Sequence, residues 1–196
     1  MTGVQTCALP IYPGFLYQQN TLRDALVAAI SLNIFNQHCD RVQMANIAQT
    51  INVLQAMALT DQGKMLLTPT YHVFEMFTPH HDATLLPAEL HCADYTWTSE
   101  KIPGLNVSAS RDQAGAIHVS LCNLNPNTPA QLICALQGAK PQRISGRVLT
   151  ADAMQAHNTF DNPETVKPAQ FDHCKLTDGG FTASLPAKSV VVLELK

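Results

Sequence analysis

Asn46 and Gln49, two residues with carboxamide side chains, interrupt a short apolar run of this sequence. Residues 42–54 read VQMANIAQTINVL, with Asn46 and Gln49 inside the run. A carboxamide has donors and acceptors to satisfy, so an interior segment normally avoids it unless partners are provided. Gln49 therefore has two interpretations: it contacts a bound ligand, or it is a buried amide that neighbouring loop backbone satisfies. Asn46 lies three residues earlier and should face the other side, where a structural role is expected.

Carboxylates are the commonest hydrolytic acids, bases and nucleophiles, but those of residues 12–86 have other local roles. One begins a helix, one ends it, one occupies a turn, one lies in mid-helix and one follows that helix. None lies where a strand ends. In chain order these residues are Asp24, Asp40, Asp61, Glu75 and Asp82. We expect no catalytic pair among them.

Two further polar groups could suggest chemistry. His80, His81 and Asp82 could bind a metal, yet adjacent histidines after a helix are typically solvated. Asp161 and Glu164 could form a carboxylate pair, but their loop is polar and has no apolar pocket to raise a pKa. We expect no metal site, no catalytic pair in that loop, and no cofactor.

The composition favours a well-buried globular protein. Charged residues make up 14% of the 196 residues and hydrophobic residues 46%, whereas a typical domain has about 25% charged residues. A formal net charge of −3 gives no electrostatic reason to expect nucleic acid or an anionic membrane as a partner. No apolar run approaches the roughly 20 residues of a membrane span.

The pattern of cysteines bears on the cellular location of this protein. The six cysteines form no C-x-x-C pair, which favours free thiols. Free thiols lean weakly toward a cytoplasmic location, and the localisation is otherwise open.

Residues 1–11, MTGVQTCALPI, resemble a translated sequencing adapter and lack the pattern of a signal peptide. We expect this segment to be a non-native leader, with part of the natural protein missing before residue 12.

The next segment predicts a helix followed by a strand. Thr21 can cap a helix, and Asp24 completes a capping box. Apolar residues then recur every fourth position, with the helix ending between residues 37 and 40. The expected apolar face consists of Leu22, Leu26, Ile30 and Ile34, joined by Val27 and Phe35. The short apolar run Val42–Ala48 predicts a strand.

A turn and a second helix follow. Asp61-Gln62-Gly63 is a turn signal between apolar residues that can pair. Thr68 and Pro69 are a cap and a first helical residue for PTYHVFEMF. The order helix–strand–helix is typical of an α/β architecture with parallel strands. One strand and two helices cannot close a sheet, so this part should belong to something larger.

From about residue 87 the pattern becomes that of an antiparallel β-sandwich. Six short alternating segments are separated by turn signals. Ile117, Val119 and Leu121 share one face of their strand, and His118, Ser120 and Cys122 share the other. The segments are LNVSAS, AIHVSLCNL, AQLICALQG, RISGRVLT, FTASLPA and SVVVLELK. Residues 156–171 form a polar loop without a period.

Three motifs together carry a resemblance: MANIAQ, LTPTYHVF and AHNTFDNP. Residues 20–77 resemble the end of the catalytic domain of family 51 glycoside hydrolases, the α-L-arabinofuranosidases. Residues 146–168 and 185–196 resemble that family's C-terminal sandwich. The resemblance implies a (β/α)8 barrel followed by a β-sandwich, with Val42–Ala48 as the eighth barrel strand. It divides the chain into the leader 1–11, a barrel fragment 12–86 and a sandwich 87–196.

The resemblance also implies a function. Such enzymes remove terminal α-L-arabinofuranosyl residues from arabinan or arabinoxylan with retention, using two glutamates about 5–5.5 Å apart. Those glutamates belong to earlier strands, so no catalytic residue is expected in this chain and the chain alone should be inactive. Gln49 matches a sugar-contacting glutamine and is expected to bind the arabinosyl unit. The expected partner is an arabinose-containing oligo- or polysaccharide, and the full enzyme is expected to be a homo-oligomer.

In an alternative interpretation, the chain is a non-catalytic carbohydrate-binding module with a β-sandwich fold. Such a module needs an exposed aromatic platform, yet only 6% of the residues are aromatic and no sandwich strand clusters Trp or Tyr. Tyr95 and Trp97 are expected in core or interdomain packing rather than in sugar stacking. The enzymatic interpretation is therefore favoured.

Overall fold

The computed structural model describes residues 20–47 and 50–196. The expected leader 1–11 and residue 49 lie outside these ranges. Helix α1 spans Leu22–Gln37, which confirms the predicted start and end. The carboxylate of Asp24 accepts hydrogen bonds from the backbone N–H of Thr21 at 2.7 Å and from its hydroxyl at 2.8 Å. These bonds fix the direction in which the chain enters the helix.

The buried face of α1 differs from the expected one. Leu22 and Leu26 are buried as predicted, but Val27, Ile34 and Phe35 are 58%, 42% and 38% exposed. Their place is taken by small or polar residues, namely Ala25, Ala29 and Asn33. The reason is that α1 lies against both a second helix and a sheet, and small side chains let the helix backbone approach them closely.

The strand predicted at Val42–Ala48 is absent from residues 42–47, which are irregular. Met44 is 75% exposed, so this run is not an interior segment here. A parallel barrel strand exists only where neighbouring strands satisfy its N–H and C=O groups. None of the described strands pairs with residues 42–47, so an apolar sequence alone does not make it a strand.

The turn and the second helix are confirmed. Strands β1 (Ala58–Asp61) and β2 (Lys64–Leu67) form an antiparallel hairpin. Gln62 has the positive φ of 51° that such a tight turn requires. Helix α2 spans Pro69–Met76, and the Thr68 hydroxyl accepts from the backbone N–H of Tyr71 at 3.2 Å.

The larger sheet of the sandwich has six strands in the order β10-β9-β13-β7-β6-β3, all antiparallel to their neighbours. Its strands are β3 (Thr84–Leu86), β6 (Leu105–Arg111), β7 (Ile117–Asn123), β9 (Ile144–Leu149), β10 (Ala169–Gln170) and β13 (Ser189–Leu195). The first of them lies before residue 87, so the sheet draws on both sides of the expected domain boundary.

The smaller sheet has the order β11-β12-β8, with β8 at Ala130–Ala135, β11 at Cys174–Thr177 and β12 at Gly180–Leu185. A Cβ on Gly180 would lie 1.9 Å from the carbonyl oxygen of Cys134, so only glycine fits this strand pairing. Strands β4 (Asp94–Trp97) and β5 (Glu100–Pro103) form a separate hairpin. All six segments predicted as sandwich strands are strands in the structure.

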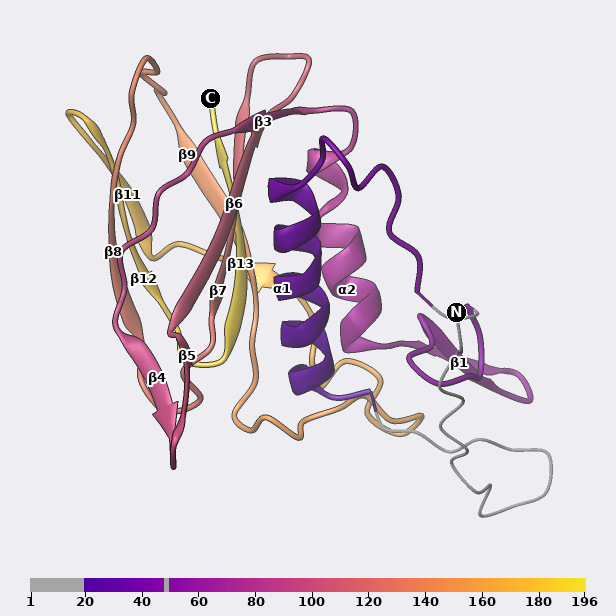
Figure 1. Ribbon diagram of the computed structural model, residues 1–196. Helices are drawn as coiled ribbons and strands as arrows, with labels where there is room; N and C mark the ends of the chain where they lie inside the picture. Colours follow the sequence, from indigo (N-terminus) through magenta and orange to yellow (C-terminus); the bar gives the residue numbers. More distant parts are fainter. Residues whose placement is uncertain (1–19, 48–49) are drawn as a thin grey trace.

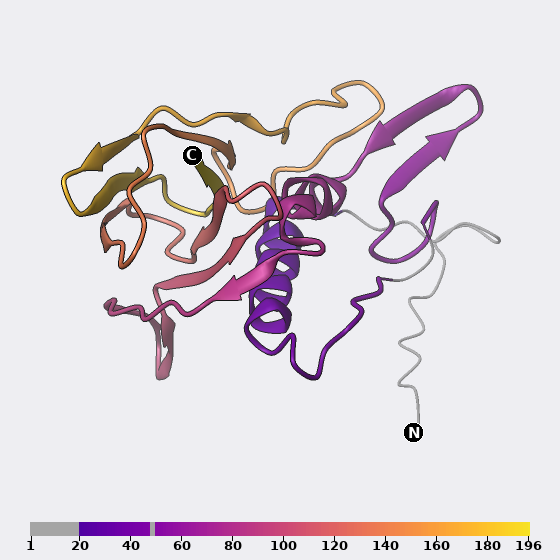
Figure 2. The same ribbon diagram turned by 90° about the horizontal axis from the view of Figure 1, so that it is seen from above.

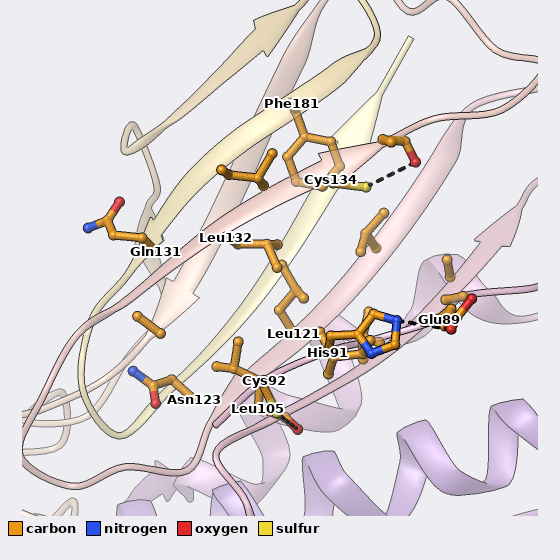
Figure 3. Close-up of a pocket in the computed structure, with 18 of the residues that line it drawn as sticks. Glu89, His91, Cys92, Leu105, Leu121, Asn123, Gln131, Leu132, Cys134 and Phe181 are labelled. Carbon is orange, nitrogen blue, oxygen red and sulfur yellow. Dashed lines mark hydrogen bonds and ion pairs between the residues drawn. The ribbon is translucent and has the colours of Figure 1, made fainter. Parts of the chain in front are cut away.

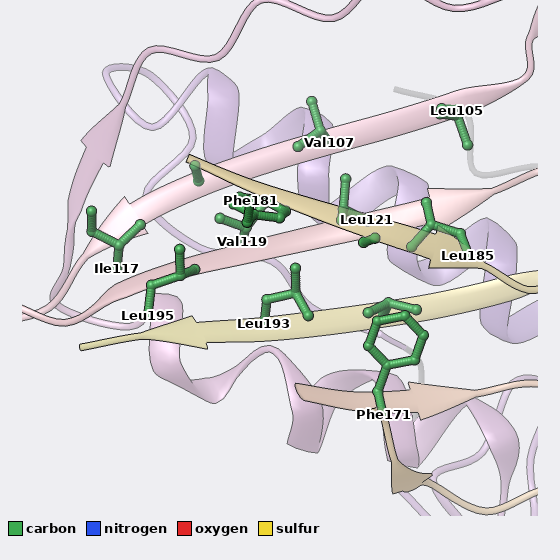
Figure 4. Close-up of a cluster of buried hydrophobic side chains, with 13 residues drawn as sticks. Leu105, Val107, Ile117, Val119, Leu121, Phe171, Phe181, Leu185, Leu193 and Leu195 are labelled. Atoms are coloured by element: carbon green, nitrogen blue, oxygen red, sulfur yellow. The ribbon is translucent and has the colours of Figure 1, made fainter. Parts of the chain in front are cut away.

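The main core lies between the two sheets (Figure 4). Ile117, Val119 and Leu121 of β7 point into it, as their alternation predicts, together with Phe181 from the smaller sheet. Fully burying one such side chain stabilises the fold by about 1.5–3 kcal/mol. This core holds the sandwich together and leaves the opposite face of the larger sheet available for other elements.

Helices α1 and α2 cover that opposite face, so the sheet is buried on both sides (Figures 1 and 2). A second core forms where Leu26 of α1 and Val73 of α2 meet Cys122, Leu149 and other sheet residues. A short 3-10 helix, η1 (Thr78–His80), follows α2. The alternate face of β7 is therefore turned toward helices rather than toward solvent.

A buried polar cluster joins α1 to the sheet. The Asn33 Oδ1 atom accepts hydrogen bonds from the hydroxyls of Ser120 at 2.6 Å and Ser108 at 2.9 Å. Its Nδ2 donates to Oδ1 of Asn106 at 2.7 Å. Asn33, Ser108 and Ser120 are each at most 1% exposed. We call this set, with Asn106, the Asn33 cluster. Because these buried polar groups form hydrogen bonds with one another, they favour a single position of α1 on the larger sheet.

Candidate functional site

Gln49, the predicted ligand-binding residue, lies outside the described residues. Asn46 is exposed, which differs from the structural role expected for it. The segment just after residue 49 is ordered by backbone pairing. The carbonyl oxygen of Thr50 accepts from the N–H groups of Met57 at 2.9 Å and Ala58 at 3.1 Å. Residues 50–57 thus form a closed loop that we call the post-49 loop.

The post-49 loop is bonded to the beginnings of both helices. Its Ala56 carbonyl oxygen accepts from Nδ2 of Asn20 and from the hydroxyl of Thr68, each at 2.8 Å. These two donors stand immediately before α1 and α2. Gln55 also donates to Oδ1 of Asp24 at 3.0 Å. Burial alone would raise the pKa of Asp24, but its hydrogen bonds from Thr21 and Gln55 lower it.

A loop of the sandwich reaches the same end of the molecule. Asn158 donates from Nδ2 to the carbonyl oxygens of Leu67 at 2.9 Å and Val166 at 3.0 Å, and it accepts from the Val166 N–H at 2.7 Å. Residues Thr21 and His157 form an isolated antiparallel bridge. Both helices, the β1–β2 hairpin and this sandwich loop therefore converge in one place (Figure 1). Sequence reasoning missed Asn20 and Asn158, whose only signal is an amide beside a helix cap and another in AHNTFDNP.

The five carboxylates of residues 20–86 lie apart from one another in the structure. Asp24 completes a cap, and Asp40 and Asp82 are exposed. Asp61 is the last residue of β1, at the hairpin turn, which corrects the expectation that none of these carboxylates lies where a strand ends. Glu75 pairs with Arg147 of β9 at 2.7 Å, with side chains 39% and 48% exposed. Such an exposed pair contributes little stability. None of these positions provides two facing carboxyl groups.

The loop carboxylates Asp161 and Glu164 also lack a catalytic environment. Both are exposed. The hydrogen bond and charge of Lys167, which lies 2.6 Å away, lower the pKa of Glu164. A general acid needs a raised pKa at neutral pH, so this shift has the opposite direction.

The two histidines after α2 differ from each other. His81 is exposed as expected, but His80 packs between Phe77 and His118, with its Nδ1 2.7 Å from the Ser110 hydroxyl. Burial, with repulsion from His118 and His81, lowers the pKa of His80 to about 4. Within the described ranges, no three His, Cys, Asp or Glu side chains are grouped as metal ligands.

The shifted pKa of His80 predicts a pH-dependent stability. The folded protein holds His80 neutral, so this contribution is complete above pH 6.5 and is lost as the pH falls toward 4. The shift corresponds to as much as about 3 kcal/mol. We expect His80→Gln to flatten the fall in unfolding free energy between pH 6.5 and 4, measured by urea denaturation. His81→Gln is the matched control, and equal pH profiles of the His80 variant and the parent protein would refute the assignment.

A cavity of about 1210 Å³ opens between the two sheets beside residues 86–95 (Figure 3). Leu121, Leu132 and Phe181 line its interior, whereas Glu89 and His91, whose exposed side chains approach to 2.9 Å, line its edge. Burial raises the pKa of the Cys134 thiol in its lining, so this thiol is not activated. The cavity is a gap in an apolar core rather than a site with converging catalytic groups.

The sandwich has no aromatic platform in its described residues. Trp97 is 68% exposed on the β4–β5 hairpin, so it does not pack in a core of the described residues. Tyr95 is half-buried on the same strand, and no other aromatic residue of the described sandwich is exposed. A single exposed indole does not make a binding surface for an extended glycan.

Residues 4–189 match the family model described as the α-L-arabinofuranosidase C-terminal domain. An intracellular exo-α-L-arabinofuranosidase from Bacteroides ovatus is 45% identical over 184 residues, which are 93% of this chain and 36% of that protein. An intracellular exo-α-(1→5)-L-arabinofuranosidase from Bifidobacterium longum is 27% identical, over 94% of this chain and 34% of that protein.

The fold is similar to that of solved relatives. The crystal structure of a family 51 arabinofuranosidase from Xanthomonas axonopodis pv. citri superposes with a TM-score of 0.92 at 43% identity, covering 96% of this chain and 38% of that one. A family 51 α-L-arabinofuranosidase from Bifidobacterium longum gives a TM-score of 0.80 at 26% identity, covering 91% and 36%. The chain spans about a third of the length of these relatives.

Proposed function

The chain belongs to the α-L-arabinofuranosidases of glycoside hydrolase family 51, and from that premise we propose that it supplies the C-terminal part of an exo-acting, retaining enzyme. Its reaction would be the hydrolysis of terminal α-L-arabinofuranosyl residues of arabinan or arabinoxylan. The observation that carries this proposal is the likeness to such enzymes along nearly the whole chain, helices and sandwich alike.

We place the active site at the end where α1 and α2 begin. In a (β/α)8 barrel the active site lies at the C-terminal ends of the strands, where the following helices start. The post-49 loop is hydrogen-bonded to both of those helix starts. With the other barrel strands beside it, Val42–Ala48 becomes a barrel strand and Gln49 stands at its end, facing the arabinosyl unit. The amide then donates to and accepts from sugar hydroxyls.

We assign the chemistry itself to the part of the enzyme that this chain does not match. Retaining hydrolysis needs one carboxylic acid and one carboxylate about 5–5.5 Å apart. The described carboxylates are caps, turn residues and exposed side chains, so they do not offer that pair. The role of this chain is to close the barrel, contribute Gln49 and attach the sandwich.

The natural partner is an arabinose-containing oligo- or polysaccharide, and the whole enzyme is a homo-oligomer in this proposal. The Bacteroides ovatus and Bifidobacterium longum relatives are named intracellular enzymes, and we propose the same location for this protein. No helix in residues 20–47 or 50–196 is long and apolar enough to cross a membrane. Size-exclusion chromatography of the complete enzyme tests the assembly, and cell fractionation tests the location.

An activity assay tests the proposed function. The chain alone should release no p-nitrophenol from p-nitrophenyl α-L-arabinofuranoside above background. A chimera should release it when residues 12–196 replace the matching C-terminal part of the Bacteroides ovatus enzyme, because this chain would complete that barrel. A chimera that folds, as judged by circular dichroism, and shows no hydrolysis would contradict the proposal. Hydrolysis by the chain alone would contradict the assignment of both glutamates to the remaining part.

A further inference from the structure

One loop of the sandwich, residues 156–158, is bonded both to the start of α1 and to the end of β2. At the start of α1, the Leu22 N–H donates to the carbonyl oxygen of Ala156 at 2.9 Å. At the end of β2, Nδ2 of Asn158 donates to the carbonyl oxygen of Leu67 at 2.9 Å. The sandwich loop therefore fixes the position of these two elements relative to each other.

The same two elements hold the post-49 loop. Asn20, just before the α1 cap, and Thr68, just after β2, each donate to the carbonyl oxygen of Ala56 at 2.8 Å. The Thr68 N–H donates to the carbonyl oxygen of Met57 at 3.1 Å, and the Met57 N–H donates to that of Thr50 at 2.9 Å. A continuous path of bonds thus runs from the sandwich loop to the residue that follows the proposed sugar-binding amide.

The Asn158 side chain has one orientation. It is 5% exposed, and its Oδ1 accepts from the Val166 N–H at 2.7 Å while its Nδ2 also donates to the Val166 carbonyl oxygen at 3.0 Å. Val166 is itself fully buried in the second core. A side chain held by burial and by several hydrogen bonds is a rigid support for the end of β2.

Apolar burial does little to fix the post-49 loop. Residues 50–52 are exposed and residues 53–55 are half-buried, whereas Ala56 is buried. A segment with few buried contacts opens locally at a low free-energy cost. Its hydrogen bonds to neighbouring elements therefore determine its position. That position matters, because a displacement of about 1 Å at a group that orients the substrate can cost about 100-fold in rate.

We propose that Asn158 is a positioning residue for the hydrolysis of arabinofuranosyl bonds. By holding the end of β2, it keeps the post-49 loop, and with it Gln49, in the place where the amide meets the sugar. The proposal rests on the function proposed above, because Asn158 acts through Gln49 rather than by touching the substrate. It gives the sandwich a role at the active site and gives the motif AHNTFDNP a function.

Amide hydrogen exchange of the full chain, followed by NMR, tests the support itself. The N–H groups of Met57 and Ala58 both donate to the Thr50 carbonyl oxygen, so their exchange reports whether the loop stays closed. In Asn158→Ala we expect these two amides to exchange about tenfold faster, because the loop loses one of its supports. Asn158→Asp keeps the acceptor for the Val166 N–H but loses the donation to β2, and it should have the same effect.

Asn123→Ala is the matched control. Asn123 is a buried asparagine of the sandwich, 1% exposed, whose Nδ2 donates to the carbonyl oxygens of Thr128, Leu185 and Pro186. Its loss should destabilise the sandwich but leave the exchange of the two loop amides within about twofold, since they exchange through local opening. Parent-like exchange in both Asn158 variants, or equal acceleration in the control, would overturn the proposal.

Kinetics of a chimera that carries residues 12–196 in the Bacteroides ovatus enzyme test the consequence for catalysis. Asn158→Ala should lower kcat/KM for p-nitrophenyl α-L-arabinofuranoside about 5- to 10-fold. In a Gln49→Ala background the same substitution should change kcat/KM by less than about twofold, because no amide is left to position. A loss of folded enzyme would act equally in both backgrounds, so an additive result would overturn the proposal.

The two experiments separate this proposal from the proposed function. A parent chimera that folds and shows no hydrolysis contradicts the proposed function, and the exchange experiment then decides by itself whether Asn158 supports the loop. An active chimera whose kcat/KM is unchanged by Asn158→Ala leaves the proposed function standing and overturns the role of Asn158.

Discussion

Replacing Asn33 by alanine is expected to lower the unfolding free energy of the chain by about 2–4 kcal/mol. The side chain is fully buried and joins α1 to two strands of the larger sheet. Alanine removes its bonds and leaves the Asn106 Oδ1 without this donor, whereas the hydroxyls of Ser108 and Ser120 keep only their contact with each other at 2.9 Å and weaker bonds. Each buried polar group without its partner costs about 1–3 kcal/mol. The measurement is urea denaturation followed by circular dichroism.

Asn46→Ala is the matched control, because it makes the same chemical change at an exposed position. Surface substitutions of this kind stay within about 0.5 kcal/mol. Equal midpoints for the Asn33 and Asn46 variants would show that the Asn33 cluster does not hold α1 on the sheet. A large effect would mean that packing of helix on sandwich depends on specific polar bonds as well as on apolar burial.

Gln49→Ala in the Bacteroides ovatus chimera is expected to lower kcat/KM for p-nitrophenyl α-L-arabinofuranoside by about 10- to 100-fold. The proposed amide makes hydrogen bonds to the sugar that orient it for attack, and alanine replaces these with empty space. The loss should fall on both kcat and kcat/KM if the bonds strengthen in the transition state.

Gln137→Ala is the control for that experiment. Gln137 is exposed on the sandwich after β8 and lies outside the proposed barrel strand. Its loss should leave kcat/KM within about twofold, as for an ordinary surface change. If the Gln137 and Gln49 variants are equally active, Gln49 does not contact the sugar.

Features with a local cause could be predicted from the sequence. The Thr21–Asp24 and Thr68–Pro69 caps depend on residues at most three positions apart, and both are present. The turn at Asp61-Gln62-Gly63 closes its hairpin for the same reason. Strand β7 could be predicted because apolar residues alternate with smaller or polar ones along it. Its apolar face meets the smaller sheet, and its other face meets the helices. The short strands β3 and β10 escaped prediction, since they are too short to show a period.

Features with a distant cause could not be predicted. Val42–Ala48 has the composition of a strand, but strand formation needs partners that a single segment cannot supply. The burial of Asn33 instead of Ile34 depends on the polar face of β7, which lies more than eighty residues away. Asn20 meets Ala56, and Asn158 meets Leu67 across 91 residues. These long-range contacts were therefore hidden, whereas Gln49 could be proposed from the sequence because it sits in a motif.

A crystal structure of the chimera with bound L-arabinose tests the central claim most directly, which is that this chain contributes a sugar-binding amide to the end of a barrel strand. The account predicts that Val42–Ala48 pairs with neighbouring parallel strands and that the Gln49 amide lies about 2.7–3.2 Å from a sugar hydroxyl. A Gln49 side chain directed away from the bound sugar, or an irregular segment 42–48 within an otherwise closed barrel, would contradict it.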